Sequence, residues 1–470
     1  MAPRSPRVQS AEVPAFTPGR SRSRVVLGDH ALVLTRDRWT CKLTGLRTAY
    51  KCRTYPDSEQ AAQLGRTFGC VRLVWNKTLD ARHRRYHTEG RSTSYTETDA
   101  ALSQWKRTED LGFLSEVSSV PLQQTLRHQH TAFSNFFAGR AKYPRFKSRT
   151  GKQSAHYTRS AFRIRDAQLF LAKQTTPLRF VWSWPEVDPT TINPTMVVVS
   201  REPDGRWYVT FAVDTDEPEP QPPTGEAIGV DLGVKDFAVL STGETIANPK
   251  HLDRKARNLA RYQRRMARKQ RGSNNRRKAK RKVARAHRKV RHARQDFLHR
   301  TTTNLVRRAD TIAIEDLHVD GMTSSARGTT EQPGRNVKQK AGLNRRILDA
   351  ALGEFRRQLE YKTTRVGTTL VVVDRWYPSS KTCSACGHLL SNLKLSVRHW
   401  TCPDCRTRHD RDHNAAKNIL AAGQAVAGQH PGQACGADVS RAGSSRTQSA
   451  MKQELSGASP TGIPALQDGE

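Results

Sequence analysis

Short apolar runs separated by turn residues dominate residues 160–213. Some alternate with polar residues, others are continuously apolar, and the turn Pro203-Asp204-Gly205 separates the last two. This pattern is typical of strands joined as hairpins, so we expect a small β-barrel here. The proline-rich segment 217–225 that follows predicts a linker between two domains.

Helical spacing of apolar side chains precedes these strands. It extends from Leu64 to Trp75, and again from Val120 to Ala138. A strand is expected near residues 48–53. The sequence therefore predicts a barrel domain over 47–216, with a helical insertion over about 57–158.

The C-terminal half, residues 226–422, has a different order of elements. We expect, in chain order, three antiparallel strands in 227–247, a helical hairpin over 254–308, a strand at 311–317, a helix over 344–362, a strand at 369–374 and a helix over 412–422. This order matches an RNase H-like α/β layer. The fold class expected for the chain is α/β with several domains.

Three acidic residues lie along these elements. Asp231 is in an apolar strand, Glu315 follows the next apolar run, and Asp412 begins the last helix. A carboxylate in an apolar strand costs free energy unless it is paired or binds a metal. Three such groups can hold two divalent ions ~3.5–4 Å apart for attack of water on a phosphodiester. Oxygen ligands favour two Mg²⁺ or Mn²⁺ ions.

Four other acids are alternatives for this role: Asp316, Asp374, Asp404 and Asp410. Asp316 should face away from Glu315 if the strand continues. Asp410 is better interpreted as a cap or first-turn acid, because a helix would aim it about 200° from Asp412.

Two cysteine pairs with C-x2-C-x15-C-x2-C spacing precede the last acid: Cys383, Cys386, Cys402 and Cys405. This spacing predicts one structural Zn²⁺ in a ribbon over residues 379–409, because four thiolates form a closed tetrahedral site. Four free buried cysteines are the alternative. His388 and His409 would serve only if a cysteine did not ligate, which we do not expect.

The other cysteines are scattered without a pairing pattern: Cys41, Cys52, Cys70 and Cys435. We therefore expect a reducing, intracellular compartment and no disulfide framework. No apolar stretch approaches the ~20 residues of a membrane-spanning helix. Residues 1–46 and 423–470 are expected to be disordered.

The chain carries 80 Lys and Arg against 43 Asp and Glu, a net charge of +37. This excess points to nucleic acid as the partner. Residues 254–300 alone hold 21 Lys or Arg and one acid, Asp296. Like charges at this density repel, so we expect the hairpin 254–308 to contact a nucleic-acid backbone. A solvated helical hairpin is the alternative.

The loop 142–149 interleaves aromatic and cationic side chains, which suits base stacking together with phosphate contacts. A packed basic loop is the alternative. The nucleic-acid contacts predicted from the loop and the hairpin are Arg145, Lys147, Arg261, Arg264, Arg265, Arg268, Lys269, Arg276, Arg277 and Lys278.

Several of these segments resemble one known family. Residues 229–233, 314–317, 379–387 and 410–419 closely resemble TnpB (OrfB) proteins. These are insertion-sequence-encoded RNA-guided nucleases related to type V CRISPR effectors. Residues 55–56, 72–76 and 143–147 resemble the N-terminal half of the same family, so the similarity covers roughly 47 to 420.

The resemblance implies an RNA-guided DNA endonuclease. Its RuvC-like domain would cover 226–422, after an OB-like wedge barrel with an inserted REC-like helical lobe. Asp231, Glu315 and Asp412 match the family's catalytic positions. The implied partners are a guide RNA, a double-stranded DNA target and a transposase of the same element, in the bacterial cytoplasm at the nucleoid. His413 departs from the family pattern, which often has an apolar residue there.

Two other functions stay open. A strand-transfer transposase shares the RNase H-like fold and an acidic triad. However, no separate helix-turn-helix is evident, and a zinc knuckle precedes the third acid. A catalytically silent nucleic-acid-binding regulator would not need all three acids. Programmable DNA cleavage by two-metal hydrolysis is the preferred prediction.

Overall fold

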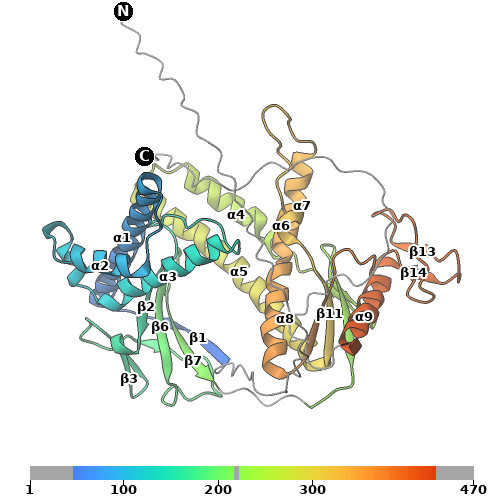
Figure 1. Ribbon diagram of the computed structural model, residues 1–470, viewed down its shortest axis with the longest axis horizontal. Helices are drawn as coiled ribbons and strands as arrows, with labels where there is room; N and C mark the ends of the chain where they lie inside the picture. Colours follow the sequence, from blue (N-terminus) through green and yellow to red (C-terminus); the bar gives the residue numbers. More distant parts are fainter. Residues whose placement is uncertain (1–45, 216–221, 430–470) are drawn as a thin grey trace, which may run out of the picture. The chain divides into compact units, whose positions relative to one another are not determined.

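Figure 1 shows the computed structural model, which describes residues 46–215 and 222–429. An antiparallel five-stranded sheet, ordered β2-β6-β7-β1-β5, forms its N-terminal part. The strands are β1 (Leu46–Thr54), β2 (Gln153–Thr158), β5 (Phe180–Val181), β6 (Pro194–Arg201) and β7 (Trp207–Thr215). Among the described residues the edge strands β2 and β5 do not pair with each other, so a closed barrel is not shown. A short hairpin of β3 (Phe162–Arg165) and β4 (Gln168–Leu171) shares the core of this sheet.

Three α-helices lie between β1 and β2 in the sequence: α1 (Ser58–Glu89), α2 (Tyr95–Trp105) and α3 (Ser119–Phe137). Asp57 begins α1 as its N-cap, because its side chain and that of Gln60 bond reciprocally to each other's backbone N–H. Leu64 and Phe68 of α1 then pack into the core of the sheet. The apolar pattern does not predict α2, since Leu102 is the one large apolar side chain that it buries.

A second five-stranded sheet, ordered β10-β9-β8-β11-β12, forms the C-terminal part. Its strands are β8 (Ala227–Leu232), β9 (Asp236–Leu240), β10 (Thr245–Ala247), β11 (Thr311–Glu315) and β12 (Thr369–Val373). The first three form the expected antiparallel meander, and β8, β11 and β12 run parallel. Parallel strands end at a common edge, so the residues that follow them in the sequence come close in space.

Helices pack on both faces of this sheet. Helices α5 (Asn274–Arg308) and α8 (Leu352–Val366) share one core with it, through residues such as Leu298, Leu305 and Phe355. Helix α9 (Arg411–Gln429) packs on the sheet through a separate cluster that includes Ala313 and Ile419, and Figure 1 shows it beside β11.

The helix predicted over 344–362 is in fact two helices. Helix α7 (Val337–Ala350) ends and α8 begins on either side of Ala351, whose φ of 57° is left-handed. This break lets Ala350 and Leu352 both reach the same buried core. The preceding turn, α6 (Val319–Met322), is short.

Helix α9 runs through Gln429, so residues 423–429 are helical and not part of a disordered tail. The rest of that tail, residues 430–470, and the N-terminal extension 1–45 lie outside the described residues, as does most of the linker 217–225. None of the helices in the described ranges has the length and hydropathy needed to cross a lipid bilayer.

Candidate functional site

Asp231 and Glu315 lie at the same edge of the C-terminal sheet. Strands β8 and β11 are parallel neighbours, with Val230 level with Ile314. The next residue on each strand is the acid, so the two carboxylates project to the same face. Glu315 ends β11, and its side chain is half-buried, as is that of Asp231.

The third acid, Asp412, comes to this edge on the first turn of α9. Helix α9 crosses β8 at Gly229, which has no side chain to keep it away. Asp231 and Asp412 line one cleft of about 130 Å³. The structure therefore brings together acids separated by most of the C-terminal half of the sequence.

Burial and neighbouring charges raise the pKa values of two of the three acids. Burial, followed by the negative charges of Asp412 and Glu315, raises the pKa of Asp231 to about 7. Burial, together with the neighbouring charge of Asp316, also raises the pKa of Glu315. Negative charges in such a site repel one another, and bound cations would relieve the repulsion.

The four alternative acids have different surroundings. Asp316 pairs with Arg356 at 2.5 Å and with Arg375, and these hydrogen bonds outweigh burial and lower its pKa. Asp410 accepts hydrogen bonds from the backbone N–H groups of Asp412 and His413, at 3.1 and 2.9 Å. The cap predicted for Asp410 is thus confirmed. Asp374 accepts a bond from the N–H of Trp376, and Asp404 is exposed.

Two residues of the cleft were not predicted from the sequence. Nη1 of Arg398 lies 3.2 and 3.0 Å from the two carboxylate oxygens of Asp412. Asp236, at the start of β9, also lines the cleft. No sequence signal distinguishes Arg398 from other surface arginines, because only the fold of the ribbon brings it to the cleft.

The four predicted zinc ligands come together. Their sulfur atoms all lie within 4.8 Å of one another, with Cys383 to Cys405 at 3.6 Å and Cys386 to Cys402 at 3.7 Å. These distances are too long for a disulfide, at ~2.05 Å. They fit a tetrahedral ion with metal–sulfur bonds of ~2.3 Å, which places its sulfurs ~3.8 Å apart. The cluster can therefore hold a structural metal.

Among the described residues, the three carboxylates do not form a group as compact as the four thiols. Acids that share two ions ~3.5–4 Å apart need not all reach the same ion. Asp412 is also turned toward Arg398. The oxygen donors and their mutual repulsion suit hard divalent cations.

His409 lies beside the thiol cluster. Its Nε2 is 3.0 Å from Sγ of Cys383, and its ring packs against Trp400 with centroids 4.6 Å apart. The four cysteines are complete without it, so His409 supports one of them through a hydrogen bond. Metal-binding residues commonly have such partners.

Two asparagines of α9 attach the ribbon to the helix that carries Asp412. The side-chain amide of Asn414 donates to the carbonyl oxygen of Thr382 at 2.7 Å, and its oxygen accepts from the N–H of Ser384 at 2.9 Å. Asn418 donates to the carbonyl oxygens of Ser379 and Thr382, at 2.8 and 2.6 Å. Both asparagines are buried. The first turn of α9 and the ribbon are thus positioned together.

His413, which departs from the pattern of the resembling family, has a contact of its own. Its Nε2 lies 3.1 Å from the carbonyl oxygen of Ser241, in the turn between β9 and β10. Gly243 of the same turn would place a Cβ 3.6 Å from this ring. His413 therefore joins α9 to the meander beside the cleft.

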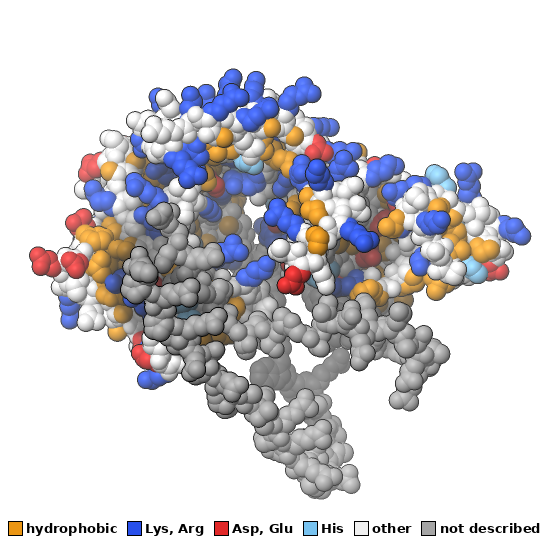
Figure 2. Space-filling model, turned by 90° about the horizontal axis from the view of Figure 1, so that it is seen from above, with side chains coloured by type: hydrophobic (Ala, Val, Ile, Leu, Met, Phe, Trp, Pro, Cys, Tyr) orange, Lys and Arg blue, Asp and Glu red, His pale blue; other side chains and the backbone are white. Residues whose placement is uncertain are grey.

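The predicted nucleic-acid contacts differ in their surroundings. Most hairpin cations are exposed and lie on α4 (His251–Ala267), on α5 or in the turn between them. Figure 2 shows many Lys and Arg and few acids on the face it views. Arg276 instead donates to the carbonyl oxygens of Met266 and Lys269, which closes the hairpin turn. The ammonium of Lys147 lies 3.9 Å from the centre of the Trp75 ring. These two side chains are already engaged within the protein.

Comparison with known proteins gives matches over most of the chain. A family model described as "Probable transposase" matches residues 210–326, and one described as "Cas12f1-like, TNB domain" matches 353–419. A Streptomyces pristinaespiralis protein, "Putative RNA-guided DNA endonuclease", is 51% identical over 90% of this chain and 99% of its own length. Escherichia coli K12 "Putative RNA-guided DNA endonuclease InsQ" is 34% identical over 80% of this chain and 92% of its own length.

The chain belongs to the TnpB (OrfB) family. Among solved structures, the chain is similar to Cas12f1 in its complex with guide RNA and target DNA. That similarity has a TM-score of 0.49 and 14% identity, over 80% of this chain and 99% of the other.

A third model of this TnpB family, described as "Helix-turn-helix domain", matches residues 46–91. The structure has the strand β1 and the single long helix α1 there. Two helices joined by a turn are therefore not formed within this segment.

Proposed function

We propose that the chain is an RNA-guided DNA endonuclease that cuts DNA by metal-dependent phosphodiester hydrolysis. One observation carries the proposal: Asp231 is level with Glu315 on adjacent parallel strands and lines the same cleft as Asp412. Burial, followed by the charges of Asp412 and Glu315, raises the pKa of Asp231 to about 7. Convergent carboxylates with perturbed pKa values are typical of functional sites. The names of the TnpB relatives support the same activity.

Asp231, Glu315 and Asp412 would hold two Mg²⁺ or Mn²⁺ ions. Such ions would supply the activation of water and the neutralisation of phosphate charge. The sheet, with parallel β8, β11 and β12 beside an antiparallel meander, is proposed to be RuvC-like, from residue 226 to the end of α9. The antiparallel N-terminal sheet would be the OB-like wedge, with α1 to α3 as the REC-like lobe.

Arg398 would change partner when DNA enters the cleft. In the structure its guanidinium neutralises Asp412. If Asp412 served as a cation ligand, the guanidinium would be available to contact the phosphate being cut, and a donor aimed at developing charge is effective in catalysis. The proposed role of Arg398 is therefore to bind and orient the phosphate.

The ribbon would act as a structural zinc domain, with Cys383, Cys386, Cys402 and Cys405 as its ligands. Its attachment to α9 through Asn414 and Asn418 places Arg398 opposite Asp412. The ion would thus affect cleavage through position and take no part in the chemistry.

The proposed partners are a guide RNA and a double-stranded DNA target. The exposed cations of the hairpin, Arg261, Arg264, Arg265, Arg268, Lys269, Arg277 and Lys278, would contact the phosphate backbone, as would Arg145. In RNA-guided systems the protein holds the heteroduplex by its backbone, while base pairing reads the sequence. These contacts predict strong salt dependence and residence at the nucleoid.

The test uses protein purified with its bound RNA, matching and non-matching duplex DNA, and Mg²⁺. Guide-matched cleavage is expected from the wild type. The Asp231→Ala variant should bind matched DNA and leave it uncut. Joined DNA ends in place of cuts would indicate strand transfer, and binding without cuts by the wild type would indicate a regulator.

A further inference from the structure

A cationic cleft lies between α4 and α5, and none of the three acids lines it. It has a volume of about 390 Å³. Lys255, Arg261 and Arg265 line it from α4, and Lys282, Arg285 and Lys289 line it from α5. Asn258 lies between Lys255 and Arg261, so the lining positions of each helix recur at three- and four-residue intervals and form one face of it.

These six cations face one another without acidic neutralisation. Among the described residues, no carboxylate lies within ion-pair distance of any of them. Three other cations of α5 are paired: Arg288 with Asp204 at 2.6 Å, Arg291 with Glu202 at 3.3 Å and Arg294 with Asp349 at 2.5 Å. The six cleft cations have no such partner, and an anion between the two faces would relieve their mutual repulsion.

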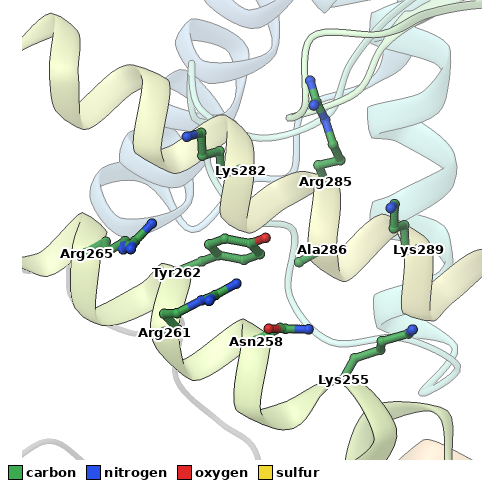
Figure 3. Close-up of a pocket in the computed structure, with 9 residues that line it drawn as sticks. All are labelled: Lys255, Asn258, Arg261, Tyr262, Arg265, Lys282, Arg285, Ala286 and Lys289. Carbon is green, nitrogen blue, oxygen red and sulfur yellow. The ribbon is translucent and has the colours of Figure 1, made fainter.

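An aromatic ring lies between the two faces. Figure 3 shows Tyr262 projecting from α4 into the space between the helices, with Ala286 across from it on α5. The small side chain of Ala286 leaves this space open. The guanidinium of Arg261 lies 5.4 Å from the centre of the Tyr262 ring. Asn258 adds an amide with one donor and one acceptor group.

We propose that this cleft binds one unpaired nucleotide of the guide RNA, with its base stacked on Tyr262 and its flanking phosphates between the two cationic faces. The inference rests on the proposed RNA-guided function and specifies a site within it. Aromatic rings beside cations are the usual means of holding unstacked nucleotides.

Three features favour this ligand. The volume is near the lower end of pockets for small ligands, ~300–1,000 Å³, so one nucleotide fits and a duplex does not. A ligand that is only a polyanion would contact the cations but would not need the Tyr262 ring. Unpaired bases that are splayed from loops and bulges are the usual targets in RNA, whereas the DNA target strand is paired along the guide. The displaced DNA strand is the competing ligand.

The experiment measures binding of RNA without DNA and without added divalent metal, in EDTA-free buffer so that the ribbon keeps its zinc. The RNA recovered from the wild-type protein is sequenced and transcribed, and single-stranded DNA of the same sequence is the comparison. Tyr262→Leu is expected to weaken RNA binding by about 5- to 150-fold, the range for loss of one stacked base. The dependence of binding on salt should not change. Chemical probing should find one unpaired base that is protected by the wild type and reactive with Tyr262→Leu.

Variants that each remove one positive charge test the phosphate contacts separately from the stacking of the base. Arg265→Gln and Arg285→Gln should each lower the slope of log affinity against log salt by about one phosphate contact. Arg300→Gln is the matched control, because Arg300 lies outside the cleft and pairs with Asp296 at 3.3 Å. It should bind RNA as the wild type does.

A second variant guards against misfolding. Ala286→Leu fills the cleft without changing charge or Tyr262, and it should reproduce the loss of affinity and of protection. Wild-type RNA affinity in both Tyr262→Leu and Ala286→Leu overturns the inference, as does a loss confined to the single-stranded DNA. Wild-type protein that carries no RNA, or cuts no matched DNA, refutes the proposed function instead.

Discussion

A Cβ on Gly229 would lie 2.2 Å from the carbonyl oxygen of Ala416. This contact between β8 and α9 sets the distance between the two elements. Asp231 and Asp412 are each a few residues from it, so the same contact sets the opening of the cleft. The absence of a side chain at position 229 is therefore a requirement of the site as well as of the core.

Gly229→Ala is expected to push α9 away from the sheet. The new methyl group would meet backbone and the Cβ of Leu420 at 2.8 Å, which cannot easily move. Overpacking of this kind costs about 1–3 kcal/mol. We expect a lower Tm, and slower DNA cleavage at temperatures where the variant is folded. Gly342→Ala on α7 is the control, since nothing lies within 4 Å of its new Cβ. Equal Tm values for the two variants would contradict the prediction.

Arg398→Gln should slow cleavage by about 10²–10³-fold, the usual cost of removing one donor that stabilises developing charge. The measurement is the single-turnover rate on matched DNA. RNA and DNA binding should remain close to wild type, because one of many cations is lost. Lys394→Gln, also on the exposed surface of the ribbon, should cut normally. A wild-type rate for Arg398→Gln would show that its ion pair with Asp412 has no catalytic purpose.

The raised pKa of Asp231 predicts a pH-dependent cost to folding of the metal-free protein. The pKa is about 7 in the folded state and ~3.9 when unfolded, so the unfolded chain releases this proton first. Stability from this group is therefore fully present below pH ~4 and is lost as pH rises through about 7. Asp231→Asn should match the wild-type Tm at pH 4 and exceed it at pH 8. The Tm of a domain of about 200 residues, such as the C-terminal part, shifts by about 2–4 °C per kcal/mol.

Asp316→Asn should change the stability in the opposite direction. The pKa of Asp316 is lowered by Arg356 and Arg375, so its carboxylate stabilises the fold above the unfolded pKa and loses this effect as pH falls. Its asparagine variant should melt below the wild type at pH 8. Differential scanning fluorimetry in EDTA-free buffer without added divalent metal, at both pH values, measures both effects. The same sign for the two variants would refute the electrostatic assignment.

Cys386→Ser should remove the structural metal. Loss of one thiolate leaves an incomplete tetrahedral site, and metal binding contributes directly to folding of such small domains. We expect about one zinc per wild-type chain and little in the variant by elemental analysis, with a lower Tm. The Cys52→Ala variant should keep the zinc content of the wild type, because Cys52 lies in the core of the N-terminal sheet and not in the thiol cluster. Full zinc content in Cys386→Ser would exclude the four-cysteine site.

Local sequence patterns predicted the parts of the site that depend on spacing. The cysteine spacing located the thiol cluster, and the apolar runs located β8, β11 and the acids at their ends. The cap role of Asp410 also followed from its position two residues before Asp412. In each case the chemistry is set by residues close together in sequence.

Features that depend on tertiary packing were not predicted. Arg398 reaches Asp412 only because the ribbon docks on α9, and no local pattern contains that information. The break at Ala351 also escapes helical periodicity, since apolar spacing continues through it and the left-handed residue is not a glycine. The N-terminal strands were predicted. Whether their sheet closes into a barrel depends on pairing between its edge strands, which short apolar runs do not specify.

The hydrogen bonds of Asn414 and Asn418 join the base of the ribbon, at Ser379 and Thr382, to α9. The two points where this segment leaves and rejoins the sheet domain are consequently held side by side, whatever lies between them. Residues between Cys386 and Cys402 can then lengthen or shorten without displacing Asp412. The ribbon between Cys386 and Cys402 can thus differ in length among relatives while the geometry at the acids stays the same.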